Sequence, residues 1–204
     1  MLGNKADYYN NLDKIYSKIW NLLENGLADR NTPFHIPVFI NGSQNTFDGR
    51  IVVLRGINQK EKKISFHSDI RSNKVKIIKL NSQGGLLFYD KSEKIQLRIC
   101  GTAKINYKND ITKKSWKKTA HMSRQCYLGE KAPGLNSDLP TSGLSDDIDN
   151  SKYTLEESEI GYKNFCVIDI FINSIEWLFL AAKGHRRAFF KLKNDVIEKK
   201  WLIA

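Results

Sequence analysis

Basic and hydroxyl side chains are the groups in this 204-residue sequence whose types and spacing could do chemistry. Arg50 and Arg55 enclose an apolar run, and strand-like alternation puts Arg50 on the same face as Val52 and Leu54. A guanidinium on an apolar face is costly to bury unless it is paired. The spacing leaves two solutions open, which are an anionic ligand and a buried carboxylate.

The segment from His67 to Lys74 (His-Ser-Asp-Ile-Arg-Ser-Asn-Lys) joins a predicted strand to a predicted helix. Backbone N–H groups and the helix dipole favour an anion at a helix N-terminus. Ser68 and Ser72 add hydroxyls there, and Lys74 adds a positive charge where compensation of the dipole alone would favour an acid. The segment predicts a phosphate site, with an ordinary capped helix and a solvated first turn as the alternative.

A third basic group lies near the end of the chain. Trp177 begins an apolar strand, and on residue type alone a core tryptophan is the commoner explanation. The bases that follow it are interrupted by one glycine and equally suit a solvated hairpin tip; they are Lys183, His185, Arg186 and Arg187.

Several classes of protein are excluded by what the sequence lacks. It has no Gly-x-Gly-x-x-Gly, no Walker loop, no His-Glu-x-x-His and no Gly-x-Ser-x-Gly, and its four histidines are scattered, so we expect no metal site. The three cysteines, Cys100, Cys126 and Cys166, include no close pair and fit a reducing compartment. With neither a signal-peptide core nor a membrane-spanning apolar stretch, a cytoplasmic protein is expected.

The charge is large and unevenly placed. Lys and Arg total 33 against 22 Asp and Glu, a net charge of +11. Residues 51–126 hold 18 bases and 5 acids, a net +13, whereas residues 127–160 hold 2 bases and 8 acids, a net −6. The surplus indicates an anionic partner, which charge alone leaves open as nucleic acid, a membrane surface or a phosphorylated ligand.

Strand patterns predominate, with helices inserted between them. Helical spacing is predicted at 7–25 (ending at Asn25-Gly26), 72–80, 110–121 and 154–164, the last with a Thr154/Glu157 capping box. Strands are predicted at 34–40, 47–57, 63–68, 86–90, 94–107, 165–172, 175–181, 187–192 and 199–203. This order favours one mainly-β domain over 1–204, a closed antiparallel, Greek-key-like β-barrel with added helices. The N-terminal helix lies within 1–28, and the loop at 129–152 is either mobile or a functional lid.

Taken in order, these motifs resemble the pyridoxamine 5′-phosphate oxidase-like family of FMN-binding split barrels, in particular a divergent, oxidase-related subfamily. The family's Arg-x-x-x-x-Arg/Lys corresponds to Arg50–Arg55, and its Phe-x-Ser/Thr-x-x-x-Ser-x-Lys to Phe66–Lys74. Leu-Leu-Phe-Tyr at 86–89 and Gln-x-Arg-x-x-Gly at 96–101 follow. Trp177 and residues 183–187 align with a C-terminal signature, Trp followed by Arg-Leu-His-Asp-Arg, so the resemblance covers about residues 30–204.

The resemblance implies FMN bound at the interface of a homodimer. The positions that match cofactor contacts are Arg50, Arg55, His67, Ser68, Ser72, Lys74, Gln96, Trp177 and Arg187, and Thr141-Ser142 loosely match a further pair near the flavin. The positions that match substrate contacts are Lys183, His185 and Arg124, the last in a segment where Trp116, Ser123, Arg124 and Tyr127 depart from the family's spacing. No catalytic side chain is expected because the flavin carries the chemistry.

The function that follows is an FMN-dependent oxidoreductase acting on a small amine or alcohol, phosphorylated or not. One alternative is a non-catalytic flavin- or haem-binding split barrel in stress response or sensing. A nucleic-acid-binding β-barrel that stacks bases on its Tyr and Phe residues ranks lower, because the bases fall at FMN-motif positions. We therefore expect no nucleic acid and no membrane among the partners.

Overall fold

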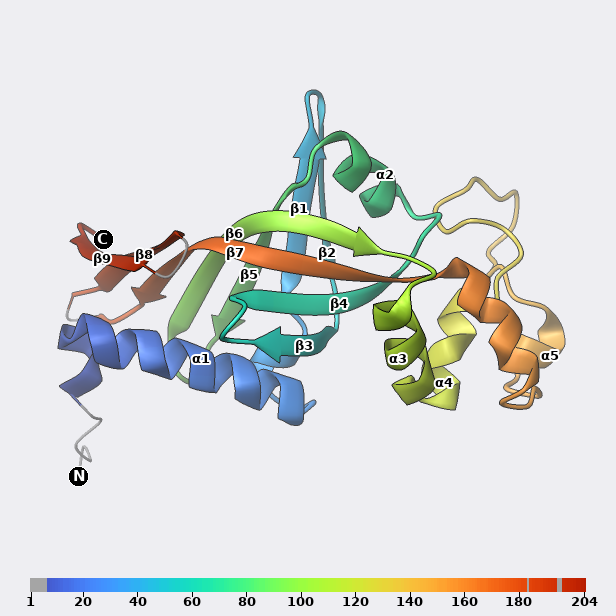
Figure 1. Cartoon of the computed structure of the whole chain (residues 1–204), viewed down its shortest axis with the longest axis horizontal. Coiled ribbons are helices and arrows are strands. Elements are labelled where there is room, and N and C mark those ends of the chain that lie inside the picture. The colour runs from blue at the N-terminus through green and yellow to red at the C-terminus, as the bar shows by residue number, and fades with distance from the viewer. Residues whose placement is uncertain (1–6, 183, 194–195) are drawn as a thin grey trace.

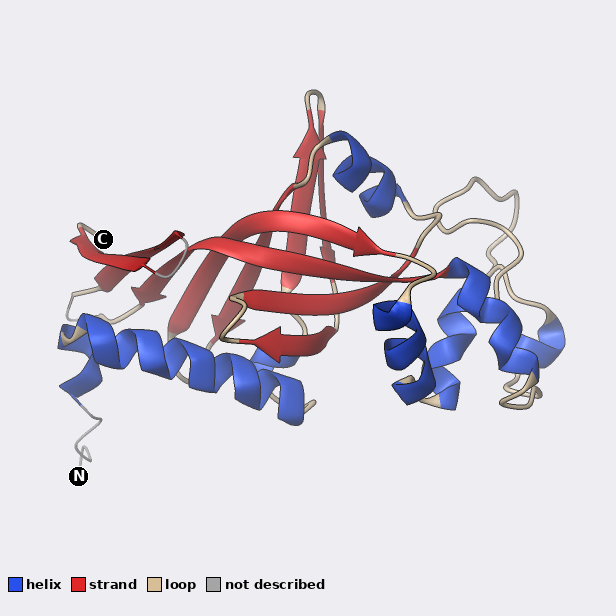
Figure 2. Cartoon of the chain, in the orientation of Figure 1, coloured by secondary structure: helices blue, strands red, loops and turns tan. Residues whose placement is uncertain are grey.

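The computed structural model describes residues 7–182, 184–193 and 196–204. Within these residues the strands form one curved sheet, with a long helix beneath it and shorter helices at one end (Figures 1 and 2). The strands are β1 (Val38–Ser43), β2 (Thr46–Ile51), β3 (Leu54–Asn58), β4 (Lys63–Asp69), β5 (Gln83–Asp90), β6 (Ile95–Asn106), β7 (Phe165–Phe179), β8 (Arg186–Lys193) and β9 (Val196–Leu202). The α-helices are α1 (Leu12–Ala28), α2 (Asn73–Leu80), α3 (Asp110–Lys118), α4 (His121–Arg124) and α5 (Asp146–Asp149).

The sheet follows the path β2-β1-β5-β6-β7-β4-β3, and every pairing between these strands is antiparallel. One edge of β7 is shared, because residues 165–171 pair with β4 while residues 174–179 pair with β8, which carries β9. In the described residues β2 and β3 end the path and do not pair with each other. The mainly-β antiparallel prediction is confirmed, with the barrel split rather than closed.

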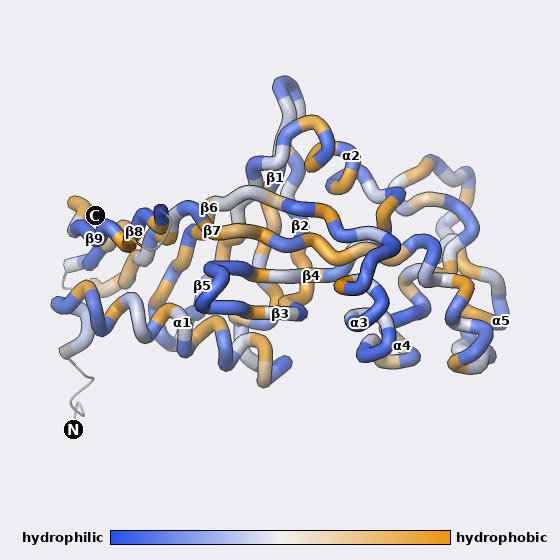
Figure 3. Tube along the Cα trace, in the orientation of Figure 1, coloured by the Kyte–Doolittle hydropathy of each residue, from blue (hydrophilic) through white to orange (hydrophobic). Residues whose placement is uncertain are grey.

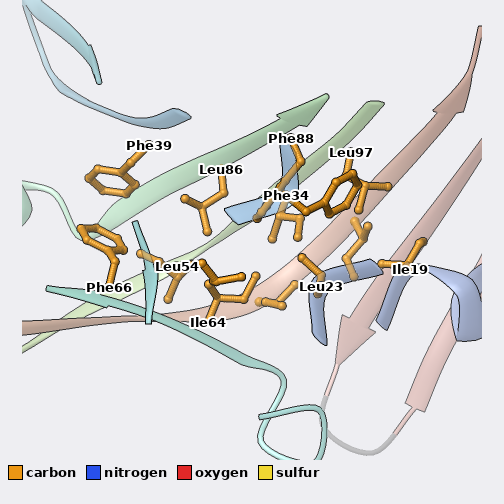
Figure 4. Close-up of a cluster of buried hydrophobic side chains, with 14 of the residues drawn as sticks. Ile19, Leu23, Phe34, Phe39, Leu54, Ile64, Phe66, Leu86, Phe88 and Leu97 are labelled. Atoms are coloured by element: carbon orange, nitrogen blue, oxygen red, sulfur yellow. The ribbon is translucent and has the colours of Figure 1, made fainter. Parts of the chain in front are cut away.

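The core lies between the sheet and α1. Apolar and polar residues alternate along the strands (Figure 3), as in β6, whose alternate residues Ile95, Leu97 and Ile99 are fully buried. Helix α1 begins at the N-cap Asn11, whose side chain accepts a hydrogen bond from the Lys14 N–H at 3.0 Å. Its apolar stripe, with Ile19 and Leu23, packs against residues of β3 to β6 and the Pro33–His35 turn (Figure 4).

Several predicted boundaries were wrong. The strand predicted at 34–40 begins only at Val38, because Pro33–His35 form a 3-10 turn. Three further differences also have a local reason. Helix α1 continues to Ala28, so Gly26 does not end it. Gly26 is instead the place where Phe34 packs closely against the helix, because a Cβ there would lie 2.7 Å from the Phe34 Cβ and carbonyl oxygen. The strand predicted at 47–57 is broken at residues 52–53, where the Val52 N–H bonds to the Pro37 carbonyl at 2.9 Å. The two strands predicted at 165–181 are the single strand β7.

A helical layer covers the start of β7 and has its own small core (Figure 1, at the end with α3, α4 and α5). This core consists of Trp116, Tyr127, Phe165 and Val167, with Tyr162 packed against it. The segment at 157–164 is a 3-10 helix, and its capping box is present, with Thr154 N–H to Glu157 Oε2 at 2.6 Å and Glu157 N–H to Thr154 Oγ1 at 3.1 Å. Among the described helices, none is long and apolar enough to cross a membrane.

Candidate functional site

A cavity of about 450 Å³ lies between strands β3 and β4 and the helical layer. Arg55, His67, Ser68 and Lys74 line one wall, so the structure brings together four of the predicted cofactor-binding residues. The opposite wall comes from the segment after α3 and is formed by Thr119, Met122, Ser123, Cys126 and Tyr127. Asp69, whose carboxylate pairs with Arg71, lines the cavity too. The site therefore combines a mainly cationic wall with a wall of hydroxyl, sulfur and aromatic groups.

Lys74, near the start of α2, is the most unusual charge in the cavity. Burial lowers its pKa, and the positive charge of Arg50 lowers it further. Its Nζ donates to Ser68 Oγ at 3.3 Å, and Ser68 Oγ lies 3.3 Å from Ser72 Oγ. Among the described residues no carboxylate comes within 4.0 Å of Nζ. A desolvated ammonium beside two hydroxyls and without a direct counter-ion is a site that an anion would complete.

Arg50 lies behind this cation. Its guanidinium pairs with Asp48 and donates to Asn41 Oδ1 at 2.6 Å, while Asn41 Nδ2 donates to the Lys74 carbonyl at 3.0 Å. Of the two solutions that the sequence left open, a carboxylate partner is present. Asn41 thus ties β1 and β2 to α2 and holds Arg50 where its charge acts on Lys74. Ser72 is the N-cap of α2 and donates to the Asp69 carbonyl at 2.7 Å.

His67 and Arg55 form the second part of the cationic wall. Burial, reinforced by the Arg55 charge, lowers the pKa of His67 to about 4, and the imidazole lies edge-on to Phe165 with ring centroids 4.7 Å apart. His67 is therefore neutral at neutral pH. The positive charge of the wall then comes from Lys74 and the exposed Arg55.

The His67 pKa predicts a pH dependence of stability. The unfolded chain binds a proton with a pKa near 6.5 and the folded chain near 4, so stability falls as the pH drops from 6.5 towards 4. The free energy of unfolding should fall by about 1 kcal/mol between pH 6.5 and pH 5.5. Urea melts at pH 7, 6 and 5 should show this loss, and His67→Gln should reduce it. The exposed His185→Gln is the control; equal pH dependence in both variants would contradict the assignment.

The remaining predicted cofactor residues lie far from this cavity in the same chain. Ser68 pairs with Cys166 near the start of β7, whereas Glu176 and Trp177 lie about ten residues further along that strand, a distance of about 33 Å. Gln96 pairs with Leu178 at that far end. Arg187 donates to both carboxylate oxygens of Glu176, at 2.9 and 3.1 Å.

Trp177 itself is not available to a ligand within its own chain. Its side chain is fully buried and packs against Tyr8 and Phe179, with ring centroids 6.5 and 6.2 Å away. The prediction of a flavin contact is not supported in the single chain, and the core-tryptophan alternative describes the residue. The reason is tertiary: the N-terminal segment before α1 covers the ring.

The predicted substrate residues are not brought together either. Arg124 is 4% exposed and uses its guanidinium internally, donating to the Trp116 carbonyl at 3.0 Å, the Thr119 carbonyl at 3.2 Å and Ser158 Oγ at 3.1 Å. In this structure the Arg124 side chain holds the helical layer together, and its contact with substrate stays a prediction. His185 is exposed, and its Nδ1 accepts from the Ala181 N–H at 3.1 Å. Lys183 lies outside the described residues.

The long loop borders a second cavity. Residues 129–144 enclose most of a space of about 650 Å³ that includes Thr141 and Ser142 and shares Cys126 with the first cavity. Arg71 fixes the loop by donating to the Glu130 carbonyl at 3.0 Å while pairing with Asp69 at 2.7 Å. The loop is therefore a wall beside the candidate site in this structure.

The residues that line the wall opposite the cations were not identified from the sequence. Sequence reasoning pointed to the segment 116–127 but selected Arg124, whereas Arg124's neighbours Ser123, Cys126 and Tyr127 line the cavity. The short turns of α4 and the 3-10 helix at Gln125–Tyr127 decide which side chains face inward. No hydrophobic period marks such short turns, so no sequence signal separated these residues from Arg124.

The fold is an antiparallel split barrel, and its cavity has a wall that carries positive charge. Residues 20–107 match the family model described as pyridoxamine 5′-phosphate oxidase, FMN-binding domain. Residues 20–107 therefore carry an FMN-binding domain of the pyridoxamine 5′-phosphate oxidase-like family, as the sequence motifs predicted. The matched residues contain the whole cationic wall, whereas Trp177 and Arg187 lie outside them.

Solved structures agree on the fold. A pyridoxamine 5′-phosphate oxidase-related, FMN-binding protein from Nostoc punctiforme is 14% identical, with a TM-score of 0.73 over 92% of this chain and 96% of that one. PhzG from Burkholderia lata, in complex with tetrahydrophenazine-1-carboxylic acid, is 12% identical, with a TM-score of 0.72 over 98% and 97%. A protein from Clostridium acetobutylicum related to general stress protein 26 is 13% identical, with a TM-score of 0.54 over 88% and 96%. No curated protein sequence matches the chain significantly.

Proposed function

We propose that the chain binds FMN in the cavity between β4 and the helical layer, with the phosphate group held by Lys74 and the hydroxyls of Ser68 and Ser72. The observation that carries this proposal is the desolvated Lys74 ammonium, which has no carboxylate at ion-pair distance among the described residues. Phosphate suits such a site because charge-assisted hydrogen bonds are stronger than neutral ones. Family membership adds a second, independent reason.

The proposed activity is that of an FMN-dependent oxidoreductase for a small amine or alcohol, phosphorylated or not. FMN, when bound, would supply a two-electron acceptor, so no protein nucleophile is needed. The chain's own residues would bind and orient the reactants. Arg55 offers a positive charge to an anionic substrate group, and Thr119 and Ser123 offer hydroxyls from the opposite wall. The carboxylic acid bound by PhzG supports an anionic substrate.

We further propose a homodimer. Gln96 and Arg187 lie about 30 Å along the sheet from the cavity of their own chain, so they could contact FMN only from a second copy. The exposed side chains Ile40 and Phe47 border an apolar hollow of about 500 Å³ across β1, β5 and β6. An apolar sheet face of this kind is typical of a subunit interface.

The proposal predicts a yellow protein. Titration with FMN should give saturable binding with a Kd at or below about 1 μM, while riboflavin should bind at least about 100-fold more weakly because it lacks the phosphate. Sedimentation should give the mass of two chains. Failure to bind FMN at tens of micromolar would overturn the flavoprotein proposal, whereas a monomer that binds FMN would overturn the dimer alone.

A non-catalytic flavin- or haem-binding role is the second candidate. One observation favours it: Arg124, the arginine expected to hold substrate, is consumed by internal hydrogen bonds. Peroxide production from pyridoxamine 5′-phosphate by the FMN-loaded protein separates the two candidates. Turnover supports the oxidoreductase, and a flavin-loaded protein that turns over no small amine or alcohol supports the carrier.

A further inference from the structure

Tyr127 is a largely buried tyrosine whose hydroxyl forms no hydrogen bond to a described residue. It ends the 3-10 helix Gln125–Tyr127 and is 8% exposed. Its ring packs edge-on against Trp116 and Phe165, with centroids 5.8 and 5.0 Å away, and its carbonyl accepts from Asn164 Nδ2 at 2.8 Å. Ring and backbone are thus fully engaged, whereas the hydroxyl makes no hydrogen bond to any described residue. The hydroxyl is not one of the fully buried, unpartnered atoms of the described residues, so it stays accessible and is free to bind a ligand.

Tyr127 belongs to the small core through its ring and also lines the cavity. Tyr127 lines the cavity on the wall opposite Ser68 and Lys74, and the charge of Arg55, also a lining residue, acts on it. Burial raises the pKa of Tyr127 well above its ordinary value, and the neighbouring cation offsets this only in part. The group therefore stays protonated and is a hydrogen-bond donor at every physiological pH.

We propose that the Tyr127 hydroxyl donates a hydrogen bond to an oxygen atom of FMN held in this cavity. The inference rests on the proposed function and adds to it a ligand-binding residue on the helical layer, outside the residues matched by the family model. A molecule whose phosphate is held by Lys74 and Ser68 fills the space between the two walls. Tyr127 then supplies the opposing donor, and binding satisfies both the unpaired hydroxyl and the desolvated ammonium.

A purely structural tyrosine would look different, and the same small core contains one. Tyr162 packs against Trp116 with ring centroids 5.9 Å apart, and its hydroxyl lies 2.9 Å from Thr112 Oγ1. That hydroxyl is half-buried, is paired within the protein and lies away from the cavity. Tyr162 is therefore the matched control for Tyr127.

The test compares Tyr127→Phe with Tyr162→Phe. We expect Tyr127→Phe to raise the Kd of FMN about tenfold, the effect of one lost hydrogen bond. The Tm of its apoprotein should stay within about 1 °C of wild type, because no protein hydrogen bond is lost. Tyr162→Phe should do the opposite, lowering the apoprotein Tm while leaving the Kd of FMN within about twofold.

Riboflavin binding locates the hydrogen bond on the ligand. A tenfold loss for both FMN and riboflavin places the acceptor on the ring or the ribityl chain, and a loss for FMN alone places it on the phosphate. A Kd within twofold for Tyr127→Phe, in a wild-type background that binds FMN, would overturn this inference and leave the proposed function standing. A Tm loss in Tyr127→Phe equal to that in Tyr162→Phe would assign Tyr127 a structural role instead. A wild type that does not bind FMN would overturn the proposed function itself.

Discussion

Lys74→Met should weaken FMN binding by about 100-fold, the largest loss expected from any single side chain in the cavity. A charge-assisted hydrogen bond to phosphate contributes up to about 3 kcal/mol, and each 1.4 kcal/mol is tenfold in Kd. Lys74 is placed to contribute near the upper end, because its ammonium is already desolvated and has no carboxylate at ion-pair distance among the described residues. Flavin fluorescence titration measures the change.

The same substitution should not destabilise the apoprotein. Burial and the Arg50 charge lower the pKa of Lys74, so its protonated form opposes folding at neutral pH, and this cost disappears only as the pH rises through the lowered pKa. Methionine keeps much of the side-chain volume and removes the charge, so the free energy of unfolding should stay the same or rise. Lys76→Met, an exposed position on the same helix, is the control and should change neither quantity. Loss of binding together with loss of stability would contradict this account.

How far the sequence could predict the site depends on how local each residue's surroundings are. His67, Ser68, Ser72 and Lys74 lie within eight consecutive residues that join a strand to a helix, so their spacing alone predicts that they converge. For Arg50 the sequence left two kinds of partner open, an anionic ligand or a carboxylate. Its carboxylate partner, Asp48, lies on the same strand, and the spacing does not reveal whether the two side chains meet.

Other positions depend on contacts that local patterns do not contain. Trp177 is buried by Tyr8, about 170 residues earlier in the chain. Strand β7 continues through residues 173–174 because β6 pairs with it on both sides of a bulge at this point. Gly26, taken from the sequence as a helix end, is instead a contact with Phe34. The mainly-β antiparallel fold was predictable because alternation in the strands is strong, whereas these packing details were not.

Arg124→Met should destabilise the protein by about 3 kcal/mol or more, because the two backbone carbonyls and the buried Ser158 hydroxyl lose a charged hydrogen-bond donor. In a chain of this length such a loss corresponds to a fall in Tm of roughly 6–12 °C. The guanidinium lies 4.6 Å from the Trp116 ring, donates to two backbone carbonyls, and contacts Ser158 and Glu159, at 2.5 Å for the latter. It therefore joins α3, α4 and the 3-10 helix at 157–164, and methionine satisfies none of these acceptors.

This result would separate a structural arginine from a substrate-binding one. If Arg124 holds the helical layer, Tm falls, and FMN bound by folded protein at low temperature keeps a Kd within about threefold, since the Lys74 wall lies on β4 and α2. The exposed neighbour Met122→Ala, which lines the cavity, is the control and should leave Tm nearly unchanged. A variant that melts like wild type but loses turnover of an amine substrate would return Arg124 to the substrate site. The buried geometry argues against that outcome, because every nitrogen of the guanidinium already donates to an acceptor within the protein.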